Sequence, residues 1–459
     1  MQSLTPRHLP TYEHLLAALE QECQAFNASL DSRRVSNPAS CLVPRVLSEQ
    51  SAGFEAFRQV FGTEIAPQLS ASNGGRYWGF VTGGANPVAT YADWLVTLYN
   101  QNVSKGGDSV ASQVERQAIK WITELFELPA VFEGVMTTGA TAANVLGAMV
   151  ARQEVGRQQG IDVAKVGCKD LDYAVFAATP HASMVKALGL AGLGQESWVQ
   201  VACEPNSEAM DTIDLASKLA ECRGPGKIVI ASAATVTGTD YDDLVRVAQL
   251  CRQHQAWLHV DGAFGIFERL LMGPQGKTQG IELADSITLD CHKWLNVPYD
   301  CGVFLTRHPH TLLATCNVDA PYLANSDAEQ PFMSLGIENS RRFRALPVWA
   351  TLLAYGKQGI RAQIQRNVDQ ANALANWVNA SDGYELNKPC ALNVVVFSAS
   401  DKNKLDTQTV LAQLNESGQV FMTPGMWQGK AVIRCAFSNW RTEMQDVELA
   451  ITELARLAS

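Results

Sequence analysis

The first helix that the hydrophobic pattern predicts lies near the start of the chain. Apolar side chains recur there at helical spacing, at Tyr12, Leu15, Leu16 and Leu19. Thr11 stands just before them and can cap the first turn with its hydroxyl group. We therefore expect an amphipathic helix that begins after Thr11.

A longer helical pattern covers residues 92–128. Its apolar stripe consists of Trp121, Ile122, Leu125 and Phe126. Before it, residues 74–87 (GGRYWGFVTGGANP) combine glycines with aromatic side chains. That composition predicts a loop, and ordered loops often carry functional residues.

Short apolar runs alternate with helical segments between residues 131 and 306. The clearest runs are YAVFAAT (173–179), KIVIASAAT (227–235), WLHVDGA (257–263), SITLDCH (286–292) and CGVFLTR (301–307). Such alternation predicts an α/β fold with a mainly parallel sheet that helices cover on both faces. Functional residues in such sheets usually lie at the carboxyl ends of the strands.

The pattern changes after Pro347. A long helical stretch covers residues 348–380, residues 391–400 and 430–438 read as antiparallel strands, and residues 441–457 read as a closing helix. This order predicts a small C-terminal α+β domain. We therefore expect a helical segment over residues 1–75, a large domain over 76–345 and the small domain over 346–459.

Charge and cysteine spacing exclude several classes of function. The 459 residues include 36 basic and 46 acidic side chains, for a net charge of -10 and no basic run, so nucleic-acid binding is not expected. The 11 cysteines form no C-x-x-C pair, so no zinc site is expected. GPQGKT (273–278) lacks the first glycine of a phosphate-binding P-loop, because Leu271 stands in its place.

The same features predict where the protein works. The N-terminal segment carries Glu13, Glu20 and Glu22 and has no apolar core, so it does not read as a secretory signal. No uncharged apolar run is long enough to span a membrane. Cysteines then serve as small core residues, and we expect a cytoplasmic protein without a membrane partner.

Polar residues follow several of the predicted strands. In residues 135–152 (VMTTGATAANVLGAMVAR) a small, hydroxyl-rich turn opens a helix with no charge in its first turns. The free N–H groups of such a helix start, with the hydroxyl groups of Thr138 and Thr141, suit a phosphate, although an ordinary helix start has the same composition. His181 follows the next strand, and its imidazole either caps a helix or stacks on an aromatic ring.

The later strands end in groups that complete one constellation. Thr235 and Thr237 follow one buried strand, and Asp261 ends another, where a buried carboxylate needs a partner. Lys293 follows the next strand inside a run that otherwise reads as buried. A phosphate, an aromatic ring, a ring nitrogen and an aldehyde would satisfy these groups together, and pyridoxal 5'-phosphate has all four.

HVDGAFG (259–265) followed by DCHKWLNVPYDCG (290–302) resembles the group II pyridoxal-phosphate-dependent amino-acid decarboxylases. This family includes aromatic-amino-acid, glutamate, histidine and diaminobutyrate decarboxylases. The resemblance extends from about Gly75 to the C-terminus, and its further segments are GFVTGGANP (79–87), ERQAIKWITELFELP (115–129), RRFRALPVWATLLAYGKQGI (341–360) and MTPGMWQGKAVIRCAFSNWRT (422–442).

The resemblance implies an aminotransferase-like fold with a seven-stranded type of sheet, and a homodimer with active sites at the subunit interface. It implies that Lys293 carries the cofactor as a Schiff base, that Asp261 binds the pyridine nitrogen and that His181 stacks on the ring. The remaining cofactor contacts that it implies are Ala140, Thr141 and His292 at the phosphate, Ala263 beneath the ring and Thr235 at its edge. Residues 80–82 would line the pocket of a small amino-acid substrate.

Two positions depart from the family pattern. Many members have asparagine three residues before the lysine, whereas this chain has Asp290, whose carboxylate either turns away from the phosphate or meets a cation. A loop tyrosine donates a proton in the animal aromatic-amino-acid decarboxylases. Phe332 aligns there and cannot donate, Tyr322 is an alternative, and His181 is a third candidate.

The expected reaction is decarboxylation of an L-amino acid to the amine and carbon dioxide. The alternatives are another pyridoxal-phosphate reaction on the same fold, namely transamination, carbon–carbon lysis or decarboxylation-coupled oxidative deamination, and a catalytically silent dimeric scaffold. A buried lysine opposite a buried aspartate argues against the scaffold. Arg434 and Arg441 are candidates to meet a substrate carboxylate, or they serve the small domain's own structure.

Overall fold

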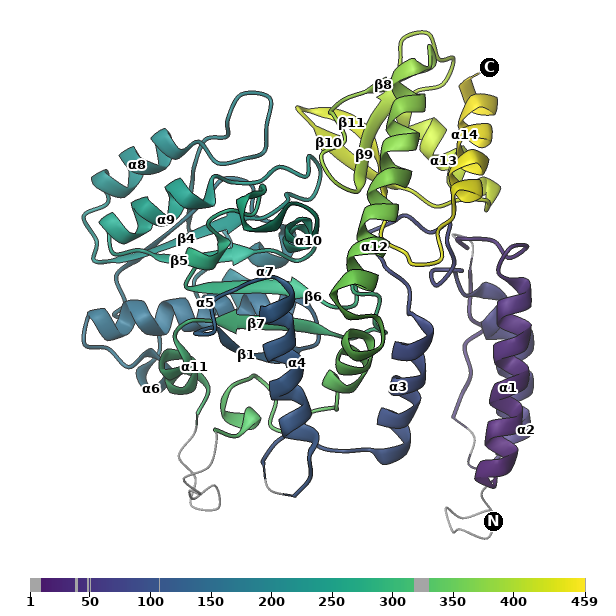
Figure 1. The fold of residues 1–459 in the computed structure, drawn as a ribbon, viewed down its shortest axis with the longest axis horizontal. Helices are drawn as coiled ribbons and strands as arrows, with labels where there is room; N and C mark the ends of the chain where they lie inside the picture. The colour runs from purple at the N-terminus through teal and green to yellow at the C-terminus, as the bar shows by residue number, and fades with distance from the viewer. Residues whose placement is uncertain are drawn as a thin grey trace.

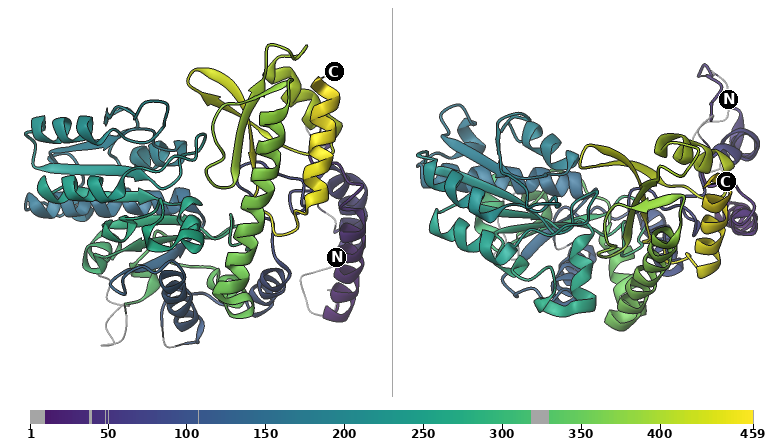
Figure 2. Two further views of the ribbon diagram at one scale, coloured as in Figure 1. Left: turned by 45° about the horizontal axis from the view of Figure 1, so that its top comes forward. Right: turned by 90° about the horizontal axis from the view of Figure 1, so that it is seen from above.

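The computed structural model describes residues 10–37, 40–47, 49, 51–106, 108–317 and 330–458. An α/β body carries a smaller antiparallel sheet, and the first helices stand at the side of the molecule away from the large sheet (Figures 1 and 2). These first helices are α1 (Tyr12–Ser29) and α2 (Gly53–Val60). Thr11 caps α1 as expected, since its Oγ1 accepts a hydrogen bond from the His14 backbone N–H at 3.2 Å.

The large sheet has seven strands in the order β1-β7-β6-β5-β4-β2-β3. Their bounds are β1 (Glu133–Thr137), β2 (Tyr173–Ala177), β3 (Trp198–Gln200), β4 (Gly226–Ser232), β5 (Trp257–Asp261), β6 (Ser286–Asp290) and β7 (Gly302–Thr306). Only β7 runs antiparallel to its neighbours, so the expectation of a mainly parallel sheet is confirmed. Every residue of β5, β6 and β7 is buried, as a sheet covered on both faces requires.

Helices cover both faces of this sheet (Figure 1). On one face lie α5 (Ala140–Gln158), α7 (Ala182–Leu190) and α11 (Pro309–Cys316), and α5 crosses β4 to β7. On the other face lie α8 (Thr212–Glu221) and α9 (Leu244–Gln253). The short helices α6 (Val163–Val166) and α10 (Arg269–Met272) complete the large unit.

The C-terminal part forms a four-stranded antiparallel sheet in the order β10-β11-β9-β8. Its elements are β8 (Tyr384–Leu386), β9 (Val394–Ala399), α13 (Thr407–Ser417), β10 (Thr423–Trp427), β11 (Lys430–Ala436) and α14 (Met444–Ala458). The long helix α12 (Ala345–Ala380) leads into it and is kinked at Gly356, whose φ of 57° is left-handed. The expected small α+β unit is therefore present.

The helical pattern over residues 92–128 forms two helices and not one. α3 (Pro87–Tyr99) ends at Asn100, which adopts a left-handed conformation, and α4 (Ala111–Leu125) begins after a polar connection. Asparagine tolerates that conformation better than most residues and commonly ends helices. In the described part of the chain, no helix is both long and apolar enough to cross a bilayer.

A buried ion pair joins α4 to the segment before α12. Arg341 and Glu115 are both fully buried and form two hydrogen bonds, of 2.7 and 3.1 Å, between guanidinium and carboxylate. Arg341 also donates to the carbonyl oxygens of Val103 and Met136, and Glu115 accepts the Met136 N–H. The pair therefore fixes the position of β1 beneath α4.

Replacing Arg341 by leucine should destabilise the fold by about 3–5 kcal/mol, because the Glu115 carboxylate would stay buried without a cation. Urea and thermal unfolding followed by circular dichroism measure the loss. Arg456→Leu is the control, since Arg456 pairs with Glu453 on an exposed helix face, where such pairs contribute about 0–1 kcal/mol. Equal losses in the two variants would contradict the assignment.

Candidate active site

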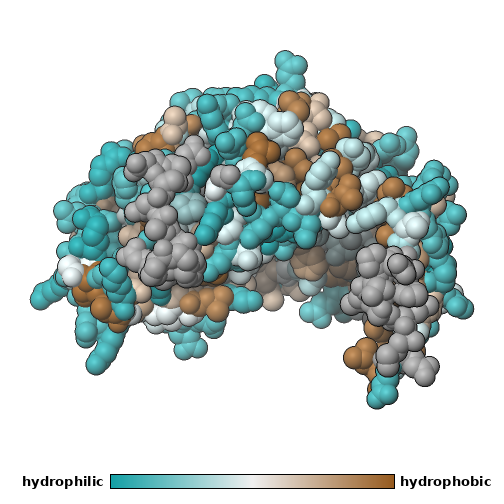
Figure 3. All heavy atoms as spheres, turned by 90° about the horizontal axis from the view of Figure 1, so that it is seen from below, coloured by the Kyte–Doolittle hydropathy of each residue, from teal (hydrophilic) through white to brown (hydrophobic). Residues whose placement is uncertain are grey.

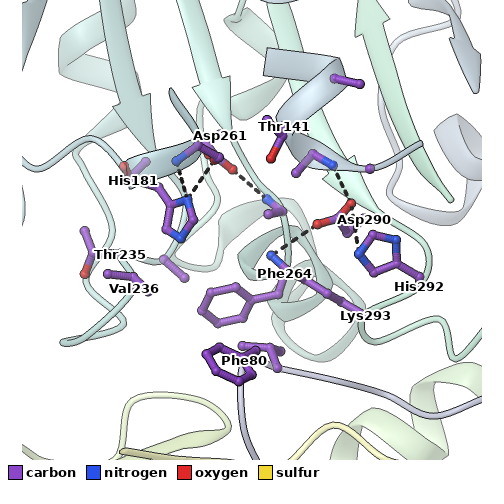
Figure 4. Close-up of a pocket in the computed structure, with 18 of the residues that line it drawn as sticks. Phe80, Thr141, His181, Thr235, Val236, Asp261, Phe264, Asp290, His292 and Lys293 are labelled. Carbon is purple, nitrogen blue, oxygen red and sulfur yellow. Dashed lines mark hydrogen bonds and ion pairs between the residues drawn. The ribbon is translucent and has the colours of Figure 1, made fainter. Parts of the chain in front are cut away.

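The predicted site residues meet in one cavity of about 480 Å³ at the carboxyl ends of the large sheet's strands (Figure 4). The cavity is lined by Ala140, Thr141, His181, Thr235, Asp261, Ala263, His292 and Lys293, and also by Thr138. Thr237 is not among the residues that line it. β1, β4, β5 and β6 all end at this edge, because the parallel strands point the same way.

The N-terminus of α5 forms one wall. Gly139 caps the helix with a φ of 151°, a conformation that favours glycine, and a Cβ there would lie 3.0 Å from His292 Cε1. The first N–H groups of a helix have no partner within it, so they attract oxyanions. Ala140 N–H donates to the Asp290 carboxylate at 2.6 Å, which shows that this helix end does bind an oxyanion.

Asp290 is the last residue of β6, and its carboxylate lies beside Lys293, His292 and the start of α5. Its Oδ2 is 3.2 Å from Lys293 Nζ, and its Oδ1 is 3.6 Å from His292 Nε2. Of the two arrangements considered for Asp290, the structure shows the one in which the carboxylate meets a cation (Figure 4). The same carboxylate therefore contacts both the helix end and the lysine.

Asp261 ends β5 and is 9% exposed. Its Oδ1 accepts the Ala263 N–H at 3.1 Å, and its Oδ2 accepts an N–H of Asn144 at 3.0 Å. Both bonds hold the carboxylate in one orientation at the cavity wall. A carboxylate at this position can bind the protonated nitrogen of a heterocycle.

His181 caps α7, and its Nδ1 lies 2.7 Å from Ser183 Oγ and accepts the Ser183 N–H at 3.0 Å. His181 is exposed in the single chain. The protein atoms that do surround the ring lower the pKa of His181 by desolvation, which outweighs the opposing effect of Asp261. Desolvation likewise lowers the pKa of His292, whose Nδ1 accepts the Cys301 N–H at 3.2 Å.

The loop over residues 79–86 covers the cavity. Phe80 and Val81 both have left-handed φ angles, of 57° and 58°, which are rare for bulky and for β-branched residues and cost about 1–3 kcal/mol each. Phe80 lies at the cavity beside Phe264, as Figure 4 shows. Thr82 does not line the cavity, but its hydroxyl lies 3.2 Å from Tyr299 Oη.

Tyr299 and Phe264 line the cavity but were not expected from the sequence as site residues. The Tyr299 ring lies 4.5 Å from the His292 ring, and Lys293 Nζ lies 6.0 Å from the centre of the Phe264 ring. Both residues stand within the segments that carried the family resemblance. The sequence signal that could have identified Phe264 and Tyr299 as site residues was their closeness along the chain to Asp261 and Lys293.

The two arginines considered for a substrate carboxylate lie in different places. Arg434, on β11, lines the cavity and is 6% exposed, and within the described part of the chain its Nε and Nη2 have no hydrogen-bond partner. Desolvation lowers the pKa of Arg434. Arg441 lies outside the cavity, donates to Asn27 and stacks on Trp440 at 4.5 Å.

Phe332 lies outside the cavity. It is buried beneath the guanidinium of Arg341, 5.0 Å from the ring centre, so it has a structural place next to the buried ion pair. Tyr322 falls outside the described residues. Of the candidates that lie in the described part of the chain, His181 lines the cavity and Phe332 does not.

Known proteins match both the sequence and the fold. The sequence pattern of the pyridoxal-dependent decarboxylase conserved domain matches residues 41–400. The aromatic-L-amino-acid decarboxylase of Bacillus atrophaeus is 30% identical over 400 residues, which cover 83% of this chain and 81% of that protein. The L-2,4-diaminobutyrate decarboxylase of Rhizobium meliloti is 30% identical over 320 residues, or 67% of this chain and 62% of that protein.

A similar solved structure is TDC from Oryza sativa with PLP and tryptamine, with a TM-score of 0.89, 20% identity and full coverage of both chains. The 4-hydroxyphenylacetaldehyde synthase of Rhodiola rosea has a TM-score of 0.83 and 20% identity over 97% of this chain and 98% of the other. The chain therefore belongs to the pyridoxal-dependent decarboxylase family, and it is an amino-acid decarboxylase whose cofactor is pyridoxal 5'-phosphate.

Proposed function

We propose that Lys293, Asp261 and His181 carry the decarboxylation of an L-amino acid in the cavity described above. The observation that supports this most is that groups from the ends of β1, β4, β5 and β6 converge there with a lysine and an aspartate facing one space. When bound, pyridoxal 5'-phosphate supplies a protonated ring that accepts the electron pair of the breaking bond. The protein's own groups bind and orient the cofactor and the substrate, and they move the protons.

The residues present fit this cofactor. Lys293 Nζ would hold the aldehyde, and the Asp261 carboxylate would accept a hydrogen bond from the protonated ring nitrogen. The phosphate would bind at the start of α5, at Ala140 and Thr141, with His292 on the other side. His181 would lie on the ring, Ala263 beneath it and Thr235 at its edge.

His181 is the proposed proton donor to the substrate carbon after carbon dioxide leaves. Desolvation lowers its pKa, which makes its protonated form a stronger acid. Its Nδ1 accepts from Ser183, so Nε2 is the nitrogen that can carry the transferred proton. Phe332 cannot take this role, because it lies outside the cavity and has no proton to give.

Arg434 is the proposed partner of a substrate carboxylate. A buried guanidinium with two unpaired nitrogen atoms is costly unless an anion meets it. The aromatic rings of Phe80, Phe264 and Tyr299 line the same cavity and suit an apolar part of the substrate. The relatives named above act on different amino acids, so the substrate has to be sought with a panel that covers all of these amino acids.

We also propose a homodimer with active sites at the interface. Large apolar side chains are exposed on α1 and α3 in the single chain, among them Tyr12, Leu16, Tyr91, Trp94 and Leu98. Seen from below, the surface is hollowed between the N-terminal helices and the body (Figure 3). A second copy would cover such a surface.

A cytoplasmic location is proposed because all of the cysteines are free thiols.

An amino-acid panel tests the function. The cofactor-loaded wild type should release carbon dioxide and the matching amine from one class of L-amino acid, and borohydride should fix the cofactor on Lys293. Lys293→Ala should lose all measurable turnover, while its circular dichroism stays that of the wild type. A keto product without carbon dioxide would favour transamination. A wild type that binds no cofactor would favour the silent scaffold.

Replacing Asp290 by asparagine should tighten cofactor binding by about tenfold, which corresponds to about 1.4 kcal/mol. The Asp290 carboxylate contacts both Ala140 N–H and Lys293 Nζ, so it competes with the incoming phosphate and repels it. Fluorescence titration of the cofactor-free protein with pyridoxal 5'-phosphate measures the dissociation constant. Asp382→Asn, which removes an exposed ion pair with Lys402 outside the residues that line the cavity, is the control. Weaker binding in Asp290→Asn would refute the competition.

A further inference from the structure

A chain of buried polar groups runs from Asp261 away from the cavity. Trp257 Nε1 lies 3.0 Å from Ser286 Oγ, and Ser286 Oγ lies 2.8 Å from His259 Nδ1. His259 Nε2 lies 3.0 Å from Asn144 Oδ1, and Asn144 Nδ2 lies 3.0 Å from Asp261 Oδ2. All of these residues are buried, and the proposed chemistry uses only the last of them.

The fold places these groups in line. Trp257, His259 and Asp261 alternate along β5 and therefore share one face of the sheet, toward α5. Ser286 comes from β6 and pairs with His259 in the strand register. Gly147 on α5 makes room for the imidazole, because a Cβ there would lie 2.4 Å from His259 Cε1.

The two ends of the chain fix the direction of every hydrogen bond. An indole N–H can only donate and a carboxylate can only accept. Asn144 must therefore turn its NH₂ group to Asp261 and its oxygen to His259, which leaves the proton of His259 on Nε2. His259 Nδ1 then accepts from the Ser286 hydroxyl, and that oxygen accepts from Trp257. Burial lowers the pKa of His259 to about 4, so the neutral ring that this arrangement needs is the stable one.

Asn144 has a second branch. Its NH₂ group also donates to Ser183 Oγ at 3.2 Å, and Ser183 Oγ lies 2.7 Å from His181 Nδ1. His181 Nδ1 already accepts the Ser183 backbone N–H, which leaves the ring proton on Nε2, and the Ser183 hydroxyl, whose oxygen accepts from Asn144, shares the same acceptor. One amide group therefore contacts Asp261 directly and also contacts Ser183, which supports His181.

We propose that Asn144 and His259 are positioning residues of this decarboxylase. The oriented chain holds Asp261 as a hydrogen-bond acceptor facing the cavity, and the branch through Ser183 sets the ring orientation of His181. This inference rests on the proposed roles of Asp261 and His181. Neither Asn144 nor His259 lines the cavity, so they act through those two side chains.

The proton positions are tested without any turnover. Long-range ¹H–¹⁵N spectra of holoenzyme labelled with ¹⁵N-histidine should show His259 as the neutral ring protonated at Nε2, with the signal assigned by its loss in His259→Gln. A neutral ring protonated at Nδ1, or a positively charged ring at neutral pH, would overturn the proposed direction of the chain. A wild type without decarboxylase activity would refute the proposed function and leave this result standing.

Asn144→Asp is the matching substitution, because it keeps the size of the side chain and replaces the donor beside Asp261 with an acceptor. We expect cofactor affinity and kcat to fall by about 10- to 100-fold, the range seen when outer hydrogen-bond partners are removed at metal sites, with KM little changed. Cofactor titration measures the first and steady-state kinetics the second. Asn144→Leu, of similar size, should lose less than Asn144→Asp, because it removes the donor without adding a second anion.

Asn393→Asp is the control. Asn393 is equally buried and donates to the Phe437 carbonyl oxygen in the small domain, away from the cavity. It should lose thermal stability and keep the wild-type cofactor affinity. Wild-type affinity and kcat in Asn144→Asp would overturn the proposal, as would losses in the control that equal those in Asn144→Asp.

Discussion

The first turn of α5 lies against the end of β6 because Gly302, on the strand between β1 and β6, has no side chain. A Cβ at Gly302 would lie 2.6 Å from the backbone of Gly139 and 3.0 Å from the Ala140 nitrogen. Gly302 pairs with Thr137 on one side and with Asp290 on the other. This close approach brings the positive end of a helix to the strand that precedes Lys293, and the whole cavity is arranged around that contact.

The strand register then determines what faces the helix. Asp261 pairs with Ser232 on β4 and with Thr288 on β6, so it emerges in the middle of the sheet edge. Lys293 follows β6 by one short turn and reaches the same space from the neighbouring strand. An anionic wall at Asp261, a cation at Lys293 and a helix N-terminus therefore surround one cavity, although they lie far apart in the sequence.

Much of this arrangement could be predicted from the sequence, because strand ends in a parallel sheet must meet at one edge. His181, Asp261 and Lys293 were recognisable for that reason. Arg434 and Arg441 could not be separated, since only the antiparallel pairing of β10 and β11 decides which one reaches the cavity. Hydrophobic periodicity carries no information on tertiary packing. It therefore could not predict that the helix ends at Asn100 or that Phe332 is buried.

The hydrogen-bonded side chains behind Asp261 could not be predicted from the sequence, for a related reason. His259 and Asn144 read as ordinary positions on a buried strand and a buried helix, and no spacing rule connects residues 115 positions apart. The structure connects them because α5 crosses the sheet where Gly147 admits the imidazole.

A buried histidine at this position is costly unless both nitrogen atoms are satisfied and the ring is neutral. Both conditions hold here only with the protons directed toward the carboxylate. A leucine at position 259 would fill the space but would form no hydrogen bond to Ser286 or Asn144, so it would not fix the orientation of either side chain. The polar residue is therefore better explained by the orientation that it imposes than by its contribution to the core.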